Sequence, residues 1–297
     1  MADLKLFQLK SGKATAKRPR LFSFEKEIQK LCENNLKEFF GIDFLATEYV
    51  TGKKHAGRID TLGIDENSSP VIIEYKLASN ENVINQGLYY LDWLMDHKAD
   101  FELLCMNKFD KKIEVDWSNP RLLCIANDFT KYDDYAIGQI NRNIDLIRYR
   151  IFEDDFVIFE LASSIMQEKQ TTNLVKANKY KGIKDHKKKA SEKLIELLAA
   201  IEEFIFTLGD DIQKKELKYY FAYSRIKNFV CLEMHPSSNK IVIYLKVPYS
   251  DIKNKSSKVR DVSKIGHFGT GETEITIETI EDVEMAKTLI QRSYEIS

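Results

Sequence analysis

The chain has 297 residues, 43% of them hydrophobic, and its 45 lysines and arginines are balanced by 46 acidic residues. This length suits one large domain or two ordinary domains, each able to bury a hydrophobic core. The net charge of -1 excludes a histone-like polycation and an acidic disordered chain. Only 12 glycines and 5 prolines are present, which excludes collagen-like and low-complexity sequences.

The sequence lacks the signals of a membrane or secreted protein. Its apolar runs, such as residues 197–201, are far shorter than the roughly 18–20 residues that cross a bilayer. The N-terminus is charged and has no long apolar segment, so no secretory signal is predicted. The cysteines are too widely separated to suggest a zinc site or a disulfide framework; they are Cys32, Cys105, Cys124 and Cys231. We therefore expect a cytoplasmic protein without a membrane partner.

Residues 1–20 are predicted to form a mobile, basic N-terminal arm. They contain six basic residues, and only the apolar residues within 4–7 suggest a short strand. A helix is expected over 24–40, because apolar residues recur there at helical spacing. Ser23 is placed to cap its start, and Gly41 to end it.

The next segment alternates between strands and helices. Strands are predicted at 43–50, 58–65 and 70–77, and the last two are joined as a hairpin by the turn-like residues 66–69. Helices are predicted from residue 80 or 82 to about 96 and near 98–107, with further strands at 121–126, 144–151 and 156–161. This order predicts an α/β or α+β domain over 21–166, with a central sheet flanked by helices.

The composition changes over residues 167–189. This segment contains eight lysines, two acidic residues and little apolar periodicity, so we predict a linker between two domains. Residues 190–297 predict a smaller α+β domain. Its expected elements are a helix at 190–208, strands near 218–224, 228–234, 240–247 and 273–279, and a closing helix at 281–293.

The clearest chemical pattern lies in the predicted hairpin. Side chains alternate between the two faces of a strand, so Glu74 and Lys76 share one face. If the hairpin turns around Asn67, Asp60 lies opposite Glu74, and the Cβ atoms of such a pair are about 4.5–5.5 Å apart. The three residues before Glu74 are all β-branched, which is typical of a strand buried on both faces.

Two carboxylates so close together on a mostly apolar sheet repel each other unless a cation lies between them. Oxygen ligands that leave positions for water and phosphate suit Mg²⁺ or Mn²⁺. Asp60 and Glu74 are therefore candidate metal ligands. Lys76 would lie beside the ion, where it can assist the attacking water and offset negative charge on the phosphate. The Glu-x-Lys pattern alone is not specific, since it recurs at residues 216–218.

The sequence combines Asp60, Glu74-x-Lys76 on the next strand, and Gln86 and Tyr90 on the following helix. This combination resembles the PD-(D/E)XK nuclease superfamily, most of all its RecB-like and NucS-like branches. The resemblance covers roughly residues 20–165, and it implies a restriction-endonuclease-like mixed sheet. It also implies a nuclease that hydrolyses phosphodiester bonds in nucleic acid, expected to be DNA, with Mg²⁺ or Mn²⁺. Asp60, Glu74, Lys76 and Gln86 take the catalytic positions.

The resemblance further implies a metal-linked glutamate on the helix before the sheet. Glu25 is favoured by its spacing to the following apolar-Gln pair, and Glu27 is the alternative. Gln86 and Tyr90 are four residues apart and so share a helix face. The resemblance places both near the active site, although Tyr90 fits equally well as a core aromatic residue.

Basic residues before Asp60 are candidates to contact phosphate groups, and Tyr90 is a candidate to contact nucleic acid; the basic residues are Lys53, Lys54 and Arg58. A solvated loop is the plain alternative for these three. Nucleic acid is thus the expected partner, and a homodimer is left open. The competing interpretation is a catalytically inactive adaptor that keeps the nuclease fold and binds nucleic acid or a protein partner.

The C-terminal domain resembles a domain of unknown function that follows such nucleases and is sometimes labelled a predicted transport protein. The matching segments are 208–211, 219–223, 229–231, 244–246 and 266–271. The transport label has no support in the sequence, which offers no membrane-crossing segment. The glycines of 266–271 lack the spacing of a dinucleotide-binding motif, so we expect a turn into the following strand.

Overall fold

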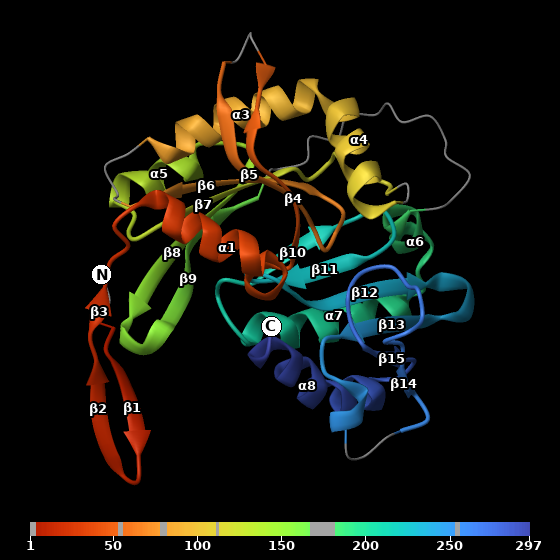
Figure 1. Ribbon diagram of the computed structural model, residues 1–297. Helices are drawn as coiled ribbons and strands as arrows, with labels where there is room; N and C mark the ends of the chain where they lie inside the picture. The colour runs from red at the N-terminus through yellow and green to blue at the C-terminus, as the bar shows by residue number, and fades with distance from the viewer. Residues whose placement is uncertain (1–3, 53–55, 78–81, 111–112, 167–181, 253–255) are drawn as a thin grey trace. The chain divides into compact units, whose positions relative to one another are not determined.

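The computed structural model describes the chain apart from residues 1–3, 53–55, 78–81, 111–112, 167–181 and 253–255 (Figure 1). The chain divides into two compact units, Met1–Gln170 and Thr171–Ser297. Each unit contains a sheet with helices packed against it, which confirms the predicted mixed α and β fold class.

The first unit is built on a seven-stranded mixed sheet. Its strands lie in the order β3, β8, β7, β6, β5, β4, and β9 pairs with β8. Strands β6, β7 and β8 are parallel to one another, and the other pairings are antiparallel. The strands are β3 (Pro19–Arg20), β4 (Ile42–Val50), β5 (Arg58–Asp65), β6 (Pro70–Lys76), β7 (Arg121–Ala126), β8 (Asn143–Phe152) and β9 (Phe156–Ile165).

Helices cover both faces of this sheet (Figure 1). Helices α3 and α4 pack against the face that carries Ile72 and Leu122. Helix α1 lies on the other face, where Cys32 is close to Tyr75. The helices are α1 (Glu25–Phe40), α3 (Val83–Asp96), α4 (Lys98–Phe109) and α5 (Lys131–Gly138), of which α5 was not expected from the sequence.

The start of α1 differs by one residue from the prediction. Phe24, not Ser23, is the N-cap residue. The Oε2 atom of Glu27 accepts hydrogen bonds from the backbone N–H groups of Ser23 and Phe24, at 2.7 and 3.0 Å. A glutamate at the third helical position caps helices in this way. Gly41 ends the helix as predicted, in the left-handed conformation with φ at 65°.

The N-terminal arm is not the mobile segment that was predicted. It forms a hairpin of β1 (Leu6–Lys10) and β2 (Lys13–Lys17), and β3 then joins the main sheet. Ser11 and Gly12 both take left-handed backbone conformations, which suit a two-residue hairpin turn. Lys17 forms an ion pair with Asp154, so a contact distant in sequence orders the base of the hairpin.

The predicted linker is wrong at its C-terminal end. Residues 167–181 lie outside the described part of the chain. The following segment forms helix α6 (Ile183–Lys189), and Ile183 is buried in the core of the second unit. A single buried apolar side chain anchors this basic helix, which explains why its composition resembled a linker.

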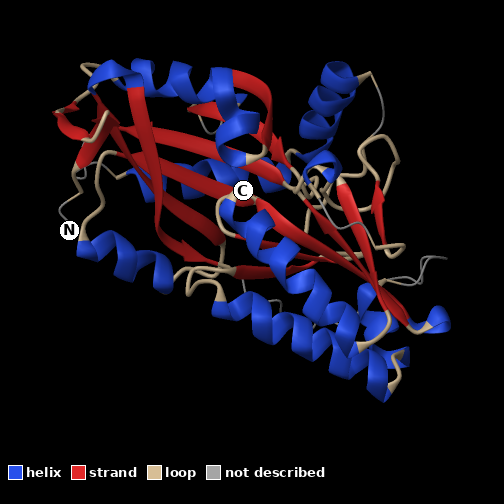
Figure 2. Ribbon diagram, turned by 90° about the horizontal axis from the view of Figure 1, so that it is seen from below, coloured by secondary structure: helices blue, strands red, loops and turns tan. Residues whose placement is uncertain are grey.

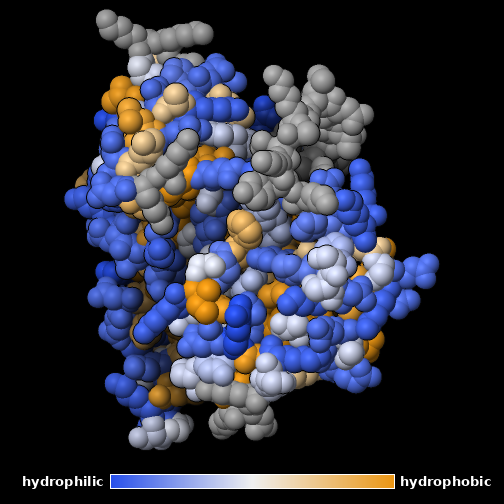
Figure 3. Space-filling view, turned by 90° about the vertical axis from the view of Figure 1, so that its right-hand side faces the viewer, coloured by the Kyte–Doolittle hydropathy of each residue, from blue (hydrophilic) through white to orange (hydrophobic). Residues whose placement is uncertain are grey.

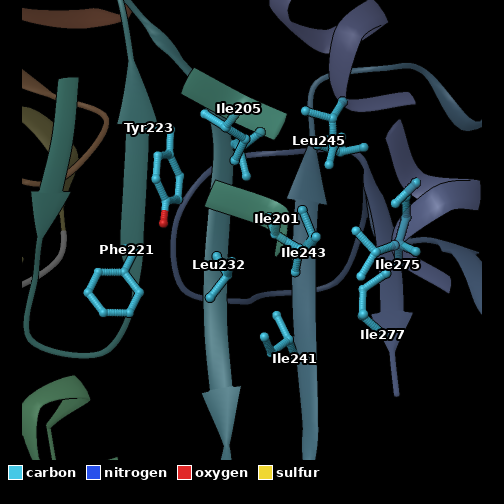
Figure 4. Packing of buried hydrophobic residues seen from close by; sticks show 14 of the residues in the cluster. Ile201, Ile205, Phe221, Tyr223, Leu232, Ile241, Ile243, Leu245, Ile275 and Ile277 are labelled. Carbon is cyan, nitrogen blue, oxygen red and sulfur yellow. The ribbon is translucent and has the colours of Figure 1, made fainter. Parts of the chain in front are cut away.

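The second unit contains a six-stranded antiparallel sheet in the order β10, β11, β12, β13, β15, β14. Ile201 and Ile205 of α7 pack against Leu232, Ile243 and Ile275 of the sheet (Figure 4). Figure 2 shows α8, which ends near the marked C-terminus, beside these strands. The elements are α7 (Glu192–Thr207), β10 (Gln213–Glu216), β11 (Phe221–Ser224), β12 (Asn228–His235), β13 (Lys240–Leu245), β14 (Val259–Asp261), β15 (Thr273–Ile277) and α8 (Ile280–Glu295).

Among the residues described, no helix is both long and apolar enough to cross a membrane. The face drawn in Figure 3 is largely hydrophilic, and hydrophobic residues are scattered across it. Scattered apolar side chains of this kind are ordinary on a folded surface.

A buried network of charges ties β5, β7 and β8 together. The guanidinium of Arg121 donates to Asp65 at 3.1 Å and to Asp145 at 2.6 Å, and all three side chains are at most 7% exposed. Asp65 also accepts hydrogen bonds from the backbone N–H groups of Asn67 and Ser69 in the β5–β6 turn. Burial alone would lower the pKa of Arg121, but its two carboxylates raise it, so the guanidinium stays charged.

Replacing Arg121 by leucine should destabilise the first unit. Arg121→Leu leaves two buried carboxylates without their cation, and losses of about 3–5 kcal/mol are typical when one partner of a buried ion pair is removed. Urea unfolding measures the change. Arg142→Leu, at an exposed position of the same unit, should change the free energy of unfolding by less than about 0.5 kcal/mol. Equal effects of the two substitutions would contradict a structural role for the network.

Candidate active site

An open cleft of about 790 Å³ lies in the first unit, at the C-terminal end of β6. The start of α1, the end of β4, the start of β5 and helix α3 supply its walls. Most of the site residues expected from the sequence meet there. The lining residues are Glu25, Val50, Gly52, Ala56, Gly57, Arg58, Asp60, Lys76, Gln86 and Tyr90.

The β5–β6 hairpin has the predicted register. Thr61 pairs with Ile73 and Leu62 with Ile72, and the next position in the same register places Asp60 opposite Glu74. The backbone N–H of Asp60 donates to Oε1 of Glu74 at 3.3 Å, and Oδ2 of Asp60 accepts from the backbone N–H of the residue after Glu74 at 3.1 Å. The two carboxylates therefore belong to one site.

Glu74 is fully buried, with 0% of its surface exposed. Its Oε2 atom has no hydrogen-bond partner among the described residues. The pKa of Glu74 is raised to about 9. Burial of the side chain is the main cause, and the nearby Asp60 carboxylate is the second. Burial also raises the pKa of Asp60, while the backbone N–H of Tyr75 and the ammonium of Lys76 lower it. Without a cation, the pair thus retains a proton at neutral pH.

Lys76 lies beside this pair and forms an ion pair with Glu25. Its Nζ atom is 3.0 Å from Oε2 of Glu25, and the Lys76 side chain is 13% exposed. Glu25 is close enough to Asp60 to contribute to the raised pKa of that carboxyl. The alternative candidate, Glu27, is used to cap α1 and is absent from the cleft lining.

Helix α3 contributes two residues with different surroundings. Gln86 is half-buried and lines the cleft. Tyr90 is 7% exposed, and its hydroxyl accepts a hydrogen bond from the backbone N–H of Arg58 at 3.2 Å. A Cβ atom at Gly57 would lie 2.5 Å from the Tyr90 ring, so this segment is packed tightly on the tyrosine. Tyr90 therefore supports the cleft wall and offers little surface to a ligand.

Of the basic residues predicted to contact phosphate, the structure describes Arg58 and leaves two undescribed. Arg58 lines the cleft, with an exposed side chain that forms an ion pair with Glu48. Lys26 binds the same carboxylate at 2.5 Å, and these cations lower the pKa of Glu48 against the effect of burial. Lys53 and Lys54 lie outside the described residues.

Gln29 is a positioning residue that the sequence analysis did not identify. Its side chain is buried, and Nε2 donates to the carbonyl oxygen of Asp60 at 2.8 Å and to Glu33 at 3.0 Å. Glu33 in turn accepts a hydrogen bond from the hydroxyl of Thr61 at 2.6 Å. The sequence feature that could have indicated this role is a glutamine one turn after Glu25, on the buried face of α1.

The residues present fit a hard divalent cation in part. Within the described part of the chain, no group of three or more His, Cys, Asp or Glu side chains is arranged to hold a metal ion. Asp60 and Glu74 nevertheless offer carboxylate oxygens on one face, and one of these oxygens is buried with no partner in the part of the chain that the structure describes. Mg²⁺ is commonly bound by one or two carboxylates together with waters and substrate phosphates. The donor set therefore suits Mg²⁺ or Mn²⁺ better than a metal that requires a closed protein cage.

The glycine-rich loop before β15 has a structural explanation. Gly269, with φ at 80°, approaches the sheet so closely that a Cβ atom would lie 2.6 Å from that of Cys231. A Cβ atom at Gly271 would likewise lie 2.7 Å from the backbone nitrogen of Leu245. The ring of His267 stacks on Tyr244, with centroids 4.2 Å apart. The glycines are needed for this close packing over the sheet.

Comparison with known proteins extends the sequence findings for the second unit. The family described as a domain of unknown function (DUF5655) matches residues 183–297, and this match begins where α6 begins. An uncharacterized protein of Haemophilus influenzae is 28% identical over 304 residues, which cover 98% of this chain and 99% of that protein. No solved structure matches the chain.

The buried carboxyl of Glu74 should make the stability of the metal-free protein depend on pH. Its ordinary pKa of 4.5 applies in the unfolded chain, and the folded value is about 9. Between these values the unfolded state binds fewer protons, so the free energy of unfolding falls as pH rises, by at most about 1.4 kcal/mol per pH unit. Glu74→Gln should remove this contribution, as measured by urea unfolding in a chelator across that pH window.

The matched control is Glu38→Gln, at an exposed position of α1. This variant should keep the pH dependence of the wild type, because it leaves the buried pair unchanged. A wild-type slope that persists in Glu74→Gln would show that Glu74 is not the titrating group.

Proposed function

We propose that the first unit is a metal-dependent nuclease that hydrolyses phosphodiester bonds in nucleic acid, with DNA as the expected substrate. The principal support is the pairing of Asp60 with Glu74, whose Oε2 atom is buried and has no partner among the described residues. A buried carboxylate oxygen without a partner is costly, and a cation shared with Asp60 would satisfy it. The resemblance of the motif to PD-(D/E)XK nucleases supports the same activity.

Asp60 and Glu74 would hold Mg²⁺ or Mn²⁺, which supplies Lewis-acid activation of the phosphate and of the attacking water. Lys76 lies on the same face and is held in place by Glu25. Its ammonium group offsets the negative charge that develops on the phosphate in the transition state. Gln86 lines the same cleft, where its amide could orient a water molecule by hydrogen bonding.

Glu25 can serve this site in two ways. As observed, its carboxylate pairs with Lys76 and fixes the position of the ammonium. If the side chain turned toward Asp60, it would supply a further oxygen ligand and release Lys76. The proposed activity requires only the first arrangement, because Asp60 and Glu74 are sufficient to bind a hydrated ion.

Nucleic acid would enter the cleft past the exposed side chain of Arg58. Arg58 lies at the start of β5, next to Asp60 in sequence and in the same cleft. Its guanidinium can bind phosphate oxygens in place of Glu48. Lys53 and Lys54 precede Arg58 in the sequence and lie outside the described residues; they are proposed to act with it through charge.

A second function has support from a specific observation. Among the described residues, no three carboxylates are arranged to hold a metal ion, and Lys76 is engaged by Glu25. This arrangement also suits an adaptor that keeps the nuclease fold and binds nucleic acid without cutting it. A nuclease requires Asp60 and Glu74 for turnover. In an adaptor, replacing these carboxylates has no effect on the binding of nucleic acid.

Nuclease assays on single-stranded, double-stranded and branched DNA test the proposal. Asp60→Asn and Lys76→Ala should each lower the cleavage rate by about 100-fold or more, the scale expected when a group that stabilises transition-state charge is removed. Calorimetry with Mn²⁺ should separate their roles. Asp60→Asn should weaken ion binding because it removes a ligand charge, whereas Lys76→Ala should retain it.

The control variants are Asp134→Asn on α5 and Lys37→Ala on α1, two exposed positions outside the cleft. Both should cleave at the wild-type rate. Cleavage that survives Asp60→Asn, Glu74→Gln and Lys76→Ala would place the activity elsewhere. Absence of cleavage, with unchanged DNA affinity in these variants, would favour the inactive adaptor.

A further inference from the structure

Helix α5 presents two exposed tyrosines on one face. Tyr132 is 71% exposed and Tyr135 is 76% exposed, whereas Ile137 of the same helix is fully buried. Successive residues of a helix are about 100° apart around the axis, so the two tyrosines are about 60° apart and lie on the side away from Ile137. Neither ring is therefore needed for the hydrophobic core under the helix.

A positive charge accompanies the two rings. The Nζ atom of Lys131 is 5.1 Å from the centroid of the Tyr132 ring. The acidic residues of the helix are directed elsewhere. The carboxylate of Asp133 accepts a hydrogen bond from the backbone N–H of Thr130 at 2.7 Å, at the start of the helix. Asp134 is about 160° around the helix axis from Tyr132.

The start of α5 lies at the edge of the sheet that carries the candidate site. Strands β6 and β7 are parallel, and Lys76 at the end of β6 pairs with Ala126 at the end of β7. Only residues 127–130 then connect β7 to α5, which packs against β9. Figure 1 shows α5 on the same side of the first unit as the start of α1, where Glu25 lines the cleft.

The distance from the cleft to α5 suits a nucleic-acid strand. Neighbouring strands of a sheet are about 4.8 Å apart, so a helix over β8 and β9 lies roughly 10–15 Å from the end of β6. A stacked strand rises about 3.4 Å per nucleotide, so about three or four nucleotides cover this distance. Arg58, at the start of β5, is on the other flank of β6. A strand that crosses the site can therefore contact Arg58 on one side and α5 on the other.

We propose that Tyr132 and Tyr135 form a platform on which unpaired bases stack, with Lys131 in contact with a phosphate of the same strand. This inference rests on the proposed binding of nucleic acid, and it holds whether the first unit cuts the strand or only binds it. Bases stack on exposed aromatic side chains with little regard to sequence. One base needs one ring, so the platform does not require the area of a protein interface. The bases of an intact duplex are stacked on each other, so the platform selects single-stranded segments.

Fluorescence anisotropy with labelled DNA, in a chelator that prevents cleavage, tests this selectivity. The full chain should bind single-stranded DNA more tightly than a blunt duplex of the same length. Tyr132→Leu and Tyr135→Leu should each lower the affinity for the single strand by about 10-fold, because leucine offers no ring to a base. Tyr132→Phe keeps the ring, so its affinity should stay within about threefold of the wild type. The affinity for the duplex should be unchanged in all three variants.

Two further variants separate stacking from charge and from a general loss of exposed rings. Lys131→Ala should lower the slope of log affinity against log salt by about 0.7, the value for one phosphate contact with a single strand, and Tyr132→Leu should leave the slope unchanged. Phe206→Leu removes a ring that is 44% exposed on α7 of the second unit, and it should bind single-stranded DNA as the wild type does.

Photo-cross-linking locates the stacked bases. Single-stranded DNA that carries 5-iodouracil should cross-link on irradiation to Tyr132 or Tyr135, as mapped by mass spectrometry of the digested protein. The same base within a duplex should give no cross-link to α5.

Single-strand affinity that is unchanged in both leucine variants, with no cross-link to α5, would overturn the platform and leave the proposed function standing. An equal loss of affinity for single strands and duplexes would also overturn it, because stacking requires unpaired bases. Absence of binding to any DNA or RNA would overturn the platform together with the proposed function. The failure of the platform alone is therefore distinguishable from the failure of both.

Discussion

The antiparallel pairing of β5 with β6 is the constraint on which the candidate site depends. A shift of one residue in a strand pair exchanges every side chain between the two faces, so Asp60 and Glu74 meet only in the observed register. The turn that sets this register is held by Asp65, which binds the backbone of the turn and the buried Arg121. A charged network at one end of the hairpin thus determines the geometry of the carboxylates at the other.

The site itself works against stability in the absence of a ligand. Glu74 is enclosed in the sheet, one of its oxygens has no partner among the described residues, and its proximity to Asp60 adds repulsion whenever both are ionised. Gln29 and the neighbouring backbone N–H groups hold the pair in place. Groups that are costly to bury and yet firmly positioned are characteristic of sites that bind a charged ligand. This combination distinguishes the pair from an ordinary surface charge cluster.

The two units differ in how their chemical features are explained. In the first unit, Asp60 and Glu74 each accept a backbone hydrogen bond, but Oε2 of Glu74 is left without a partner among the described residues, and the proposed activity supplies one. In the second, the glycine-rich loop and its aromatic stacking serve the packing of the sheet. The match to a domain of unknown function covers the second unit, so the proposed activity rests on the geometry and motif of the first.

The sequence by itself determined the main elements, the β5–β6 register and the shared face of Asp60, Glu74 and Lys76. These features follow from side-chain periodicity and turn composition, which act between near neighbours. The tertiary structure decided which glutamate enters the cleft, since Glu25 meets Lys76 from 51 residues away. It also decided that Gln29 supports Asp60, that the N-terminal arm is an ordered hairpin and that a lysine-rich segment forms α6. Each of these features depends on contacts between segments that are distant in the sequence, and the local pattern of residues does not indicate such contacts.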